Sequence, residues 1–228
     1  MLRSARNEFF SGLRDVVPLL VGAAPFGMIY GVLAVNAGIP VLAAQLMSLI
    51  VFAGSAQFIA AQLIGAAAPG FVVVLTVFIV NLRHALYSAS IAPHTRPLPR
   101  GWKWLLAYLL TDEAYAVAIN RYRDGAAGAQ HHWYFLGAGL GLWLTWQAAT
   151  AIGIFLGTEI PAGWSLDFAL ALTFIAIVVP GLKGRADVAA ALVGGAVALV
   201  AWGLPYRLGL IVAAFAGIAA GLMVARRA

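Results

Sequence analysis

Several polar residues lie inside stretches of the sequence that are otherwise apolar, and they are the residues most able to bind a ligand. Gly54, Ser55 and Gln57 place a residue without a side chain, a hydroxyl group and a carboxamide inside the apolar run 41–64. A helix that opens there frees backbone N–H and C=O groups, which lipid tolerates only where they line a cavity or bind something. We predict that these three residues bind substrate, with close helix packing at Gly54 and Ser55 as the alternative.

A second polar cluster begins at Asn81. In a helix, Asn81, His84 and Ser88 share one face, while Arg83 and Tyr87 share a neighbouring one. Arg83 lies about twelve residues into an apolar segment, where an unpaired charge is costly. We predict that Asn81 and Tyr87 bind substrate and that Arg83 and His84 serve in charge pairing or proton coupling, since histidine changes charge near neutral pH. The alternatives are that Arg83 extends to the headgroups and that His84 is structural.

Two adjacent acidic residues, Asp112 and Glu113, lie inside the apolar segment 104–119, and Thr111 precedes them as a local helix cap. Adjacent helical residues point about 100° apart, so one carboxylate can face a cavity while the other pairs elsewhere. We predict that Asp112 and Glu113 are counter-charges for Arg83 or a proton-coupling site. The alternative is that the segment lies at the surface and that both carboxylates are solvated.

The composition is that of a membrane protein. The 228 residues are 63% hydrophobic and 10% charged, with a mean hydropathy of +0.94, whereas roughly a quarter of the residues are charged in soluble domains. We therefore predict an all-α polytopic membrane protein with about 6–8 hydrophobic helical segments, forming a single transmembrane transport domain over residues 1–228.

The apolar segments differ in how well they suit a membrane crossing. Gly27 and Gly31 in the first segment predict a close helix contact. Basic residues gather in the connections between segments, and such residues concentrate on the cytoplasmic side. If the N-terminus is cytoplasmic and the segments 41–64 and 104–119 are re-entrant or broken, all of the basic loop clusters fall on that side. Seven or eight full spans are the alternative. The segments are 16–35, 41–64, 71–91, 104–119, 133–155, 166–179, 188–202 and 208–225.

A weak internal repeat divides the chain into halves 1–103 and 104–228. Phe52-Ala53 and Phe58-Ile-Ala60 recur as Phe168-Ala169 and Phe174-Ile-Ala176 at an offset of 116 residues. A duplicated half with an odd number of spans would be inverted, as in many secondary transporters. The matching residues are common in membranes, so chance similarity is the alternative.

Several other classes of function are excluded or disfavoured. The net charge of +6 comes mainly from connections between apolar segments, so we expect no nucleic-acid binding. The chain has no cysteine, and His94, His131 and His132 lack further ligands at suitable spacing, so we expect no metal site and no cofactor. There is no phosphate-binding loop and no evident nucleophile with a base, so we expect no enzymatic activity. No cleavage signal follows the basic start, so we expect the first apolar segment to remain.

In the polar clusters around Gln57, Arg83 and Asp112 described above, the chain resembles the AzlC family, the large membrane subunit of bacterial branched-chain amino acid exporters. The resemblance implies export of valine, leucine or isoleucine, with methionine as a further candidate, by a two-part carrier. We predict a secondary transporter of the inner membrane that is coupled to the proton gradient. The resemblance also implies a heteromeric complex with a small, four-span AzlD-type subunit. An intramembrane enzyme using Asp112, Glu113 and His84, or a passive amino acid channel, are the alternatives. The motifs are Pro25-Phe-Gly-Met-Ile-Tyr-Gly31, Phe52-Ala-Gly-Ser-Ala-Gln-Phe58, Asn81-Leu-Arg-His-Ala-Leu-Tyr87, Thr111-Asp-Glu113 and Asp167-Phe168.

Overall fold

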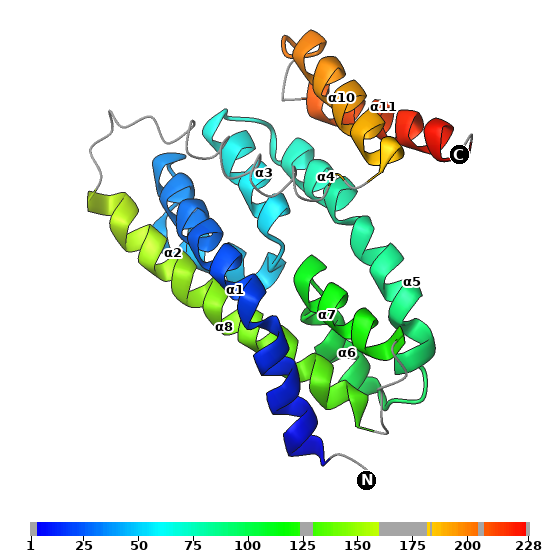
Figure 1. The fold of residues 1–228 in the computed structure, drawn as a ribbon. Helices are drawn as coiled ribbons and strands as arrows, with labels where there is room; N and C mark the ends of the chain where they lie inside the picture. Colours follow the sequence, from blue (N-terminus) through cyan, green and yellow to red (C-terminus); the bar gives the residue numbers. More distant parts are fainter. Residues whose placement is uncertain (1–3, 124–129, 160–181, 183, 205–207, 227–228) are drawn as a thin grey trace. The chain divides into compact units, whose positions relative to one another are not determined.

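The structure, a computed structural model, describes residues 4–123, 130–159, 182, 184–204 and 208–226, and every regular element among them is an α-helix (Figure 1). The all-α prediction is confirmed. The helices are α1 (Ala5–Asn36), α2 (Val41–Val51), α3 (Gly54–Gly65), α4 (Gly70–Asn81), α5 (Arg83–Thr95), α6 (Arg100–Tyr108), α7 (Asp112–Arg123), α8 (His131–Glu159), α10 (Arg185–Val200) and α11 (Leu208–Ala225).

Several helices have the length and composition of membrane spans. Among the described residues, four stretches are long and apolar enough to cross a bilayer. Their surfaces are rich in exposed Leu, Val, Ile and Phe side chains, as expected where lipid replaces water as the solvent. These stretches are Ala5–Asn36, Gly70–Thr95, His131–Thr158 and Leu208–Ala225.

The described helices fall into two compact units. The first comprises residues 1–65 and 74–162, and the second comprises residues 66–73 and 163–228. In the second unit, α10 and α11 form a helical pair that packs closely at Gly217, where an added methyl group would lie 2.8 Å from the backbone oxygen of Ala190. The polar cluster lies in the first unit. A single domain over 1–228 stays a prediction.

The first unit is built on the contact between α1 and α8, which lie side by side (Figure 1). Small residues permit this approach. A methyl group added at Gly27 would lie 2.9 Å from the Cβ of Ala149, and one added at Gly31 would lie 2.5 Å from the backbone oxygen of Thr150. The close contact predicted at Gly27 and Gly31 is therefore present, and α8 is its partner.

The first helix is longer than the predicted span 16–35, because it begins at Ala5. Ser4 caps it, with its hydroxyl accepting a hydrogen bond of 3.3 Å from the Asn7 N–H. The early turns are tied to the rest of the unit because Glu8, only 1% exposed, lies 3.4 Å from the guanidinium of Arg121. This ion pair joins residues far apart in the sequence, which hydrophobic periodicity does not reveal.

Two apolar segments are broken in the structure. The segment 41–64 is divided into α2 and α3 at Phe52, whose φ of 39° is left-handed and incompatible with a continuous right-handed helix. The segment 104–119 is divided into α6 and α7 by residues 109–111. A third discontinuity is milder: at Leu82, between α4 and α5, the backbone stays helical but closes with tighter i−3 hydrogen bonds. The proposed repeat partner at 168–176 lies outside the described residues.

Candidate functional site

The two helix breaks and the α4–α5 junction bring three predicted site residues together. Arg83 is the first residue of α5, Asp112 is the first residue of α7, and Ser55 is the second residue of α3. One guanidinium nitrogen of Arg83, Nη1, forms an ion pair with Oδ2 of Asp112. The other, Nη2, donates a hydrogen bond of 2.6 Å to the hydroxyl of Ser55. Arg83 thus links all three helix interruptions.

Local sequence explains why Asp112 stands at the start of α7. The hydroxyl of Thr111 accepts a hydrogen bond of 3.3 Å from the backbone N–H of Ala114, which is the cap expected of it. Asp112 and Glu113 both lie in the first turn, where the partial positive charge of the helix N-terminus stabilises carboxylates. Glu113 is half-buried and has no ion-pair partner among the described residues.

The ion pair leaves polar atoms available. Nε of Arg83 and Oδ1 of Asp112 are both shielded from solvent and have no hydrogen-bond partner within the described part of the chain. Buried polar atoms in folded proteins almost always have a partner, often an ordered water or a ligand. The Arg83 and Asp112 side chains are also 32% and 40% exposed. The pair can therefore accept further polar groups without being dismantled.

A cavity of about 400 Å³ adjoins these discontinuities. Asn81, His84 and Ser88, the face predicted from the sequence, form one wall of it. The Oδ1 atom of Asn81 is buried without a partner, while Nδ1 of His84 lies 3.2 Å from the backbone oxygen of Asn81. The remaining lining residues are mostly apolar. Ala85 comes from α5, and the others come from the two breaks: Ile50, Val51, Phe52, Ala53, Ala107, Tyr108 and Leu110.

Gly54 and Gln57 lie on a different side of the first break. A methyl group added at Gly54 would come within 2.8 Å of the Trp146 ring, which supports the packing explanation for this glycine. Gln57 is completely buried, and its Oε1 accepts a hydrogen bond of 3.1 Å from the indole N–H of Trp146. Neither residue lines the cavity, so their predicted substrate contacts stay predictions.

Tyr87 also lies outside the cavity lining. Its ring stacks on Tyr115 with centroids 4.5 Å apart, and Tyr115 donates a hydrogen bond of 2.8 Å to Ser90. The ring of His84 meets Tyr87 edge to face at 5.8 Å. These contacts join α5 to α7 directly beside the Arg83–Asp112 pair, so Tyr87 is placed to hold the two helices in register.

A polar layer between α2 and α8 was not predicted. Nε2 of Gln45 donates to Oε1 of Gln147 at 2.9 Å, and the hydroxyls of Ser48 and Thr150 are 3.1 Å apart. Gln147 also donates to the backbone oxygen of Ser48 at 3.2 Å. The signal was present in the sequence, because all four residues are polar side chains within apolar segments. Their pairing across about a hundred residues was not visible.

Tyr108 is a further cavity residue that the sequence analysis missed. It ends α6, lines the cavity, and donates a hydrogen bond of 2.5 Å to the backbone oxygen of Leu49 near the end of α2. It also accepts one of 2.7 Å from the indole of Trp143. Tyr108 therefore ties the two helix breaks to each other.

Comparison with known proteins identifies a matching family and several relatives of this chain. The family model described as AzlC protein matches residues 18–160. A relative from Archaeoglobus fulgidus, described as an uncharacterized membrane protein, is 34% identical over 214 residues, which are 92% of each chain. Inner membrane protein YgaZ of Escherichia coli is 27% identical over 95% of this chain and 89% of its own. Branched-chain amino acid transport protein AzlC of Bacillus subtilis is 29% identical over 75% of this chain and 68% of its own.

No solved structure matches the chain. The matched region nevertheless contains both helix breaks, the Arg83–Asp112 pair and the cavity beside them. The family model covers more than half of the chain, and a relative above 30% identity covers nearly all of it. The chain is therefore a membrane protein of the AzlC family, as its sequence motifs predict.

Proposed function

We propose that this chain is the large subunit of a secondary transporter that exports branched-chain amino acids across the inner membrane. One observation carries the proposal: Arg83 is held between Asp112 and Ser55 where two broken helices meet, beside a cavity lined by both breaks. Broken helices with a charged group near their ends are typical of transporter substrate sites. The name of the Bacillus subtilis relative supports the substrate class.

The cavity and the polar cluster beside it together offer complementary groups for each part of such a substrate. Arg83, Asp112 and Ser55 lie beside the cavity and are not among its lining residues. The carboxylate of the substrate competes with Asp112 for the guanidinium of Arg83, which has donors to spare. Its ammonium group faces Asp112 and the carbonyl end of α2, where the helix carries partial negative charge. Its branched side chain lies against Ile50, Val51 and Leu110. Ser55 and Asn81 complete the polar contacts, with Gly54, Gln57 and Tyr87 as proposed supporting residues.

We assign energy coupling to the titratable side chains near the cavity. Arg83, His84, Asp112 and Glu113 lie within the first turns of α5 and α7, so an amino acid that disturbs the ion pair also changes the surroundings of the other groups. Exchange of protons through these residues would link amino acid export to the proton gradient. Residues in these roles need no covalent step, and we infer that the chain is not an enzyme.

The partner subunit follows from the resemblance to the family, and the membrane topology follows from the basic residues in the connections and from the internal repeat. We propose a small AzlD-type membrane subunit as partner and a cytoplasmic N-terminus. We further propose that the broken segments 41–64 and 104–119 are re-entrant, and that halves 1–103 and 104–228 are an inverted repeat. Basic residues in the connection 94–103 support this orientation because such residues concentrate on the cytoplasmic side.

Transport by the purified pair tests the proposal. The full chain and its small partner are reconstituted into liposomes loaded with labelled leucine, and a proton gradient is imposed. We expect leucine movement that requires both subunits and stops when a protonophore collapses the gradient. Movement that continues after collapse would identify a passive channel instead. No movement with both subunits present would contradict the proposal.

A further inference from the structure

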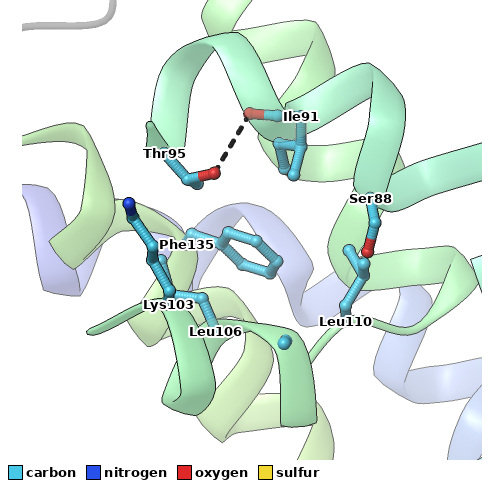
Figure 2. A pocket seen from close by; sticks show the side chains of 8 residues that line it. Ser88, Ile91, Thr95, Lys103, Leu106, Leu110 and Phe135 are labelled. Carbon is cyan, nitrogen blue, oxygen red and sulfur yellow. Dashed lines mark hydrogen bonds between the residues drawn. The ribbon is translucent and has the colours of Figure 1, made fainter. Parts of the chain in front are cut away.

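A second cavity adjoins the central one. It has a volume of about 160 Å³ and lies between α5 and α6, with Phe135 of α8 closing one side (Figure 2). Ser88, Ala107 and Leu110 line both cavities and therefore lie between the two spaces. The residues that belong to the second cavity alone are Ile91, Thr95, Lys103, Leu106 and Phe135.

The lining of this second cavity combines an apolar wall with one cation. Ile91, Leu106 and Phe135 are almost completely buried, at 4%, 2% and 1% exposure, and form the wall. Lys103 is exposed, and among the described residues that line the cavity it is the only charged one, with no carboxylate beside it in that lining. The hydroxyl of Thr95 turns back to the carbonyl of Ile91 at 3.5 Å, as Figure 2 shows. The positive charge in the cavity is therefore not neutralised by its own lining.

The partition between the two cavities belongs to a broken helix. Leu110 is 5% exposed and lies in the non-helical stretch 109–111 between α6 and α7. Its backbone N–H makes only a long hydrogen bond of 3.4 Å to the Ala107 oxygen. A segment outside regular helix can change its backbone angles without unwinding a helix. Leu110 thus lies between the two cavities in a segment outside regular helix, where it packs in a buried cluster with Ile91, Leu106 and Phe135.

We propose that the second cavity is a peripheral binding site for an α-amino acid with an apolar side chain, separated from the central cavity by Leu110. The carboxylate pairs with the ammonium group of Lys103, and the side chain lies against Ile91, Leu106 and Phe135. The volume is roughly ten times what one water molecule needs, so a short branched chain has room. The identity of the ligand rests on the proposed function; the location does not.

This site fits an early position on the export route. Lys103 lies in the first turn of α6 and is one of the basic residues of the stretch 94–103 that we place on the cytoplasmic side. A positive charge at the mouth of an apolar cavity attracts a carboxylate, and apolar walls select against polar side chains. The amino acid then passes Leu110 to reach Arg83.

Cysteine accessibility can test the two cavities separately, because the natural chain contains no cysteine. Thr95 lines only the second cavity and Ala85 lines only the central one. Thr95→Cys and Ala85→Cys are each introduced into the full chain, reconstituted with its small partner, and labelled with a small methanethiosulfonate reagent with and without leucine. We expect leucine to slow labelling at both positions by at least several-fold.

The same measurement on an Arg83→Gln background makes the result decisive. Loss of Arg83 disables the central site, so we expect leucine protection to disappear at Ala85→Cys and to persist at Thr95→Cys. Protection at Ala85→Cys alone in the natural background would overturn the peripheral site and leave the proposed function standing. Protection at neither position would overturn both.

Two matched controls test the role of Lys103. Lys103→Gln should abolish leucine protection at Thr95→Cys, whereas Arg100→Gln, which removes another charge from the same turn but not from the lining, should leave it intact. Protection at Ala85→Cys in the Lys103→Gln chain shows that this variant is folded. Leucinamide, which lacks the carboxylate, should not protect Thr95→Cys; equal protection by leucine and leucinamide would overturn the pairing with Lys103.

Discussion

The break between α2 and α3 has two sides with opposite character. Towards α8, the polar groups of Gln45, Ser48 and Gln57 make hydrogen bonds to Gln147, Thr150 and Trp146 and exclude solvent. Towards α5 and α7, Ser55 meets the half-exposed Arg83–Asp112 pair beside an open cavity. Intramembrane polar residues thus serve packing on one side and remain available to a ligand on the other. Which of these holds depends on the open space around the residues, not on residue type. Unpartnered buried atoms occur on both sides, since Oε1 of Gln45 and Nε2 of Gln57 also have no hydrogen-bond partner among the described residues.

The largest effect on transport should come from substitutions on the side of the break that faces α5 and α7, which we call the open side. Arg83→Ala and Asp112→Ala should each abolish leucine export, because each leaves the opposite charge without its partner in a lipid-surrounded site. Export is measured in liposomes containing equal amounts of folded protein. The double variant Arg83→Asp, Asp112→Arg should recover part of the activity. Natural export rates in both single variants would remove the ion pair from the mechanism.

A large effect on folding should come from substitutions on the side that faces α8, which we call the packed side, and it should be measurable as a loss of stability. Gly31→Val should lower the thermal stability of the purified protein and the yield of folded chain, because its Cβ would press against the Thr150 oxygen and the Ile154 nitrogen at 2.5 and 2.6 Å. Overpacking of this kind costs about 1–3 kcal/mol or more. Gly22→Ala is the matched control, since nothing lies within 4 Å of its added methyl group. Equal melting temperatures for the two variants would contradict the close contact.

Much of the open side could be anticipated from the sequence. Ser55, Arg83 and Asp112 were each conspicuous as polar residues within apolar segments, and Thr111 caps α7 as its type and position predict. The phase of Asn81, His84 and Ser88 along a helix gave the cavity wall correctly. These features depend on local rules, namely helix periodicity, capping and the cost of charge in lipid.

The packed side could not be anticipated in the same way. Periodicity shows which residues share a face, but not which distant helix will cover that face. Gly27 and Gly31 indicate a close helix contact but do not identify α8 as the partner helix. The sequence likewise does not indicate that Glu8 forms an ion pair with Arg121. For the same reason the sequence does not reveal the hydrogen bond between Gln57 and Trp146.

Substitutions at Gln57 and Trp146, with a moderate expected effect on stability, test the role of Gln57. Trp146→Phe removes the indole donor and leaves the Oε1 atom of Gln57 buried without it, which costs about 1–3 kcal/mol of stability. Gln57→Leu combined with Trp146→Phe should recover part of this loss, because both polar groups are then gone. Thermal unfolding of the four proteins in a double-mutant cycle measures the coupling. In transport, a raised KM for leucine in the Gln57→Leu variant would support the proposed role of Gln57 in substrate binding, and an unchanged KM would leave Gln57 as a packing residue only.

The smallest expected effect lies at Tyr108, where the two breaks meet. Tyr108→Phe removes only a hydroxyl, which donates to the Leu49 oxygen and accepts from Trp143. A single hydrogen bond of this kind contributes about 0.5–1.5 kcal/mol, so we expect a change of a few-fold in the KM for leucine and little change in yield. Trp143→Phe is the control, because it removes the donor to Tyr108 while keeping the contact with Leu49. If Trp143→Phe raises KM as much as Tyr108→Phe does, the tie between α6 and α2 is not what shapes the cavity.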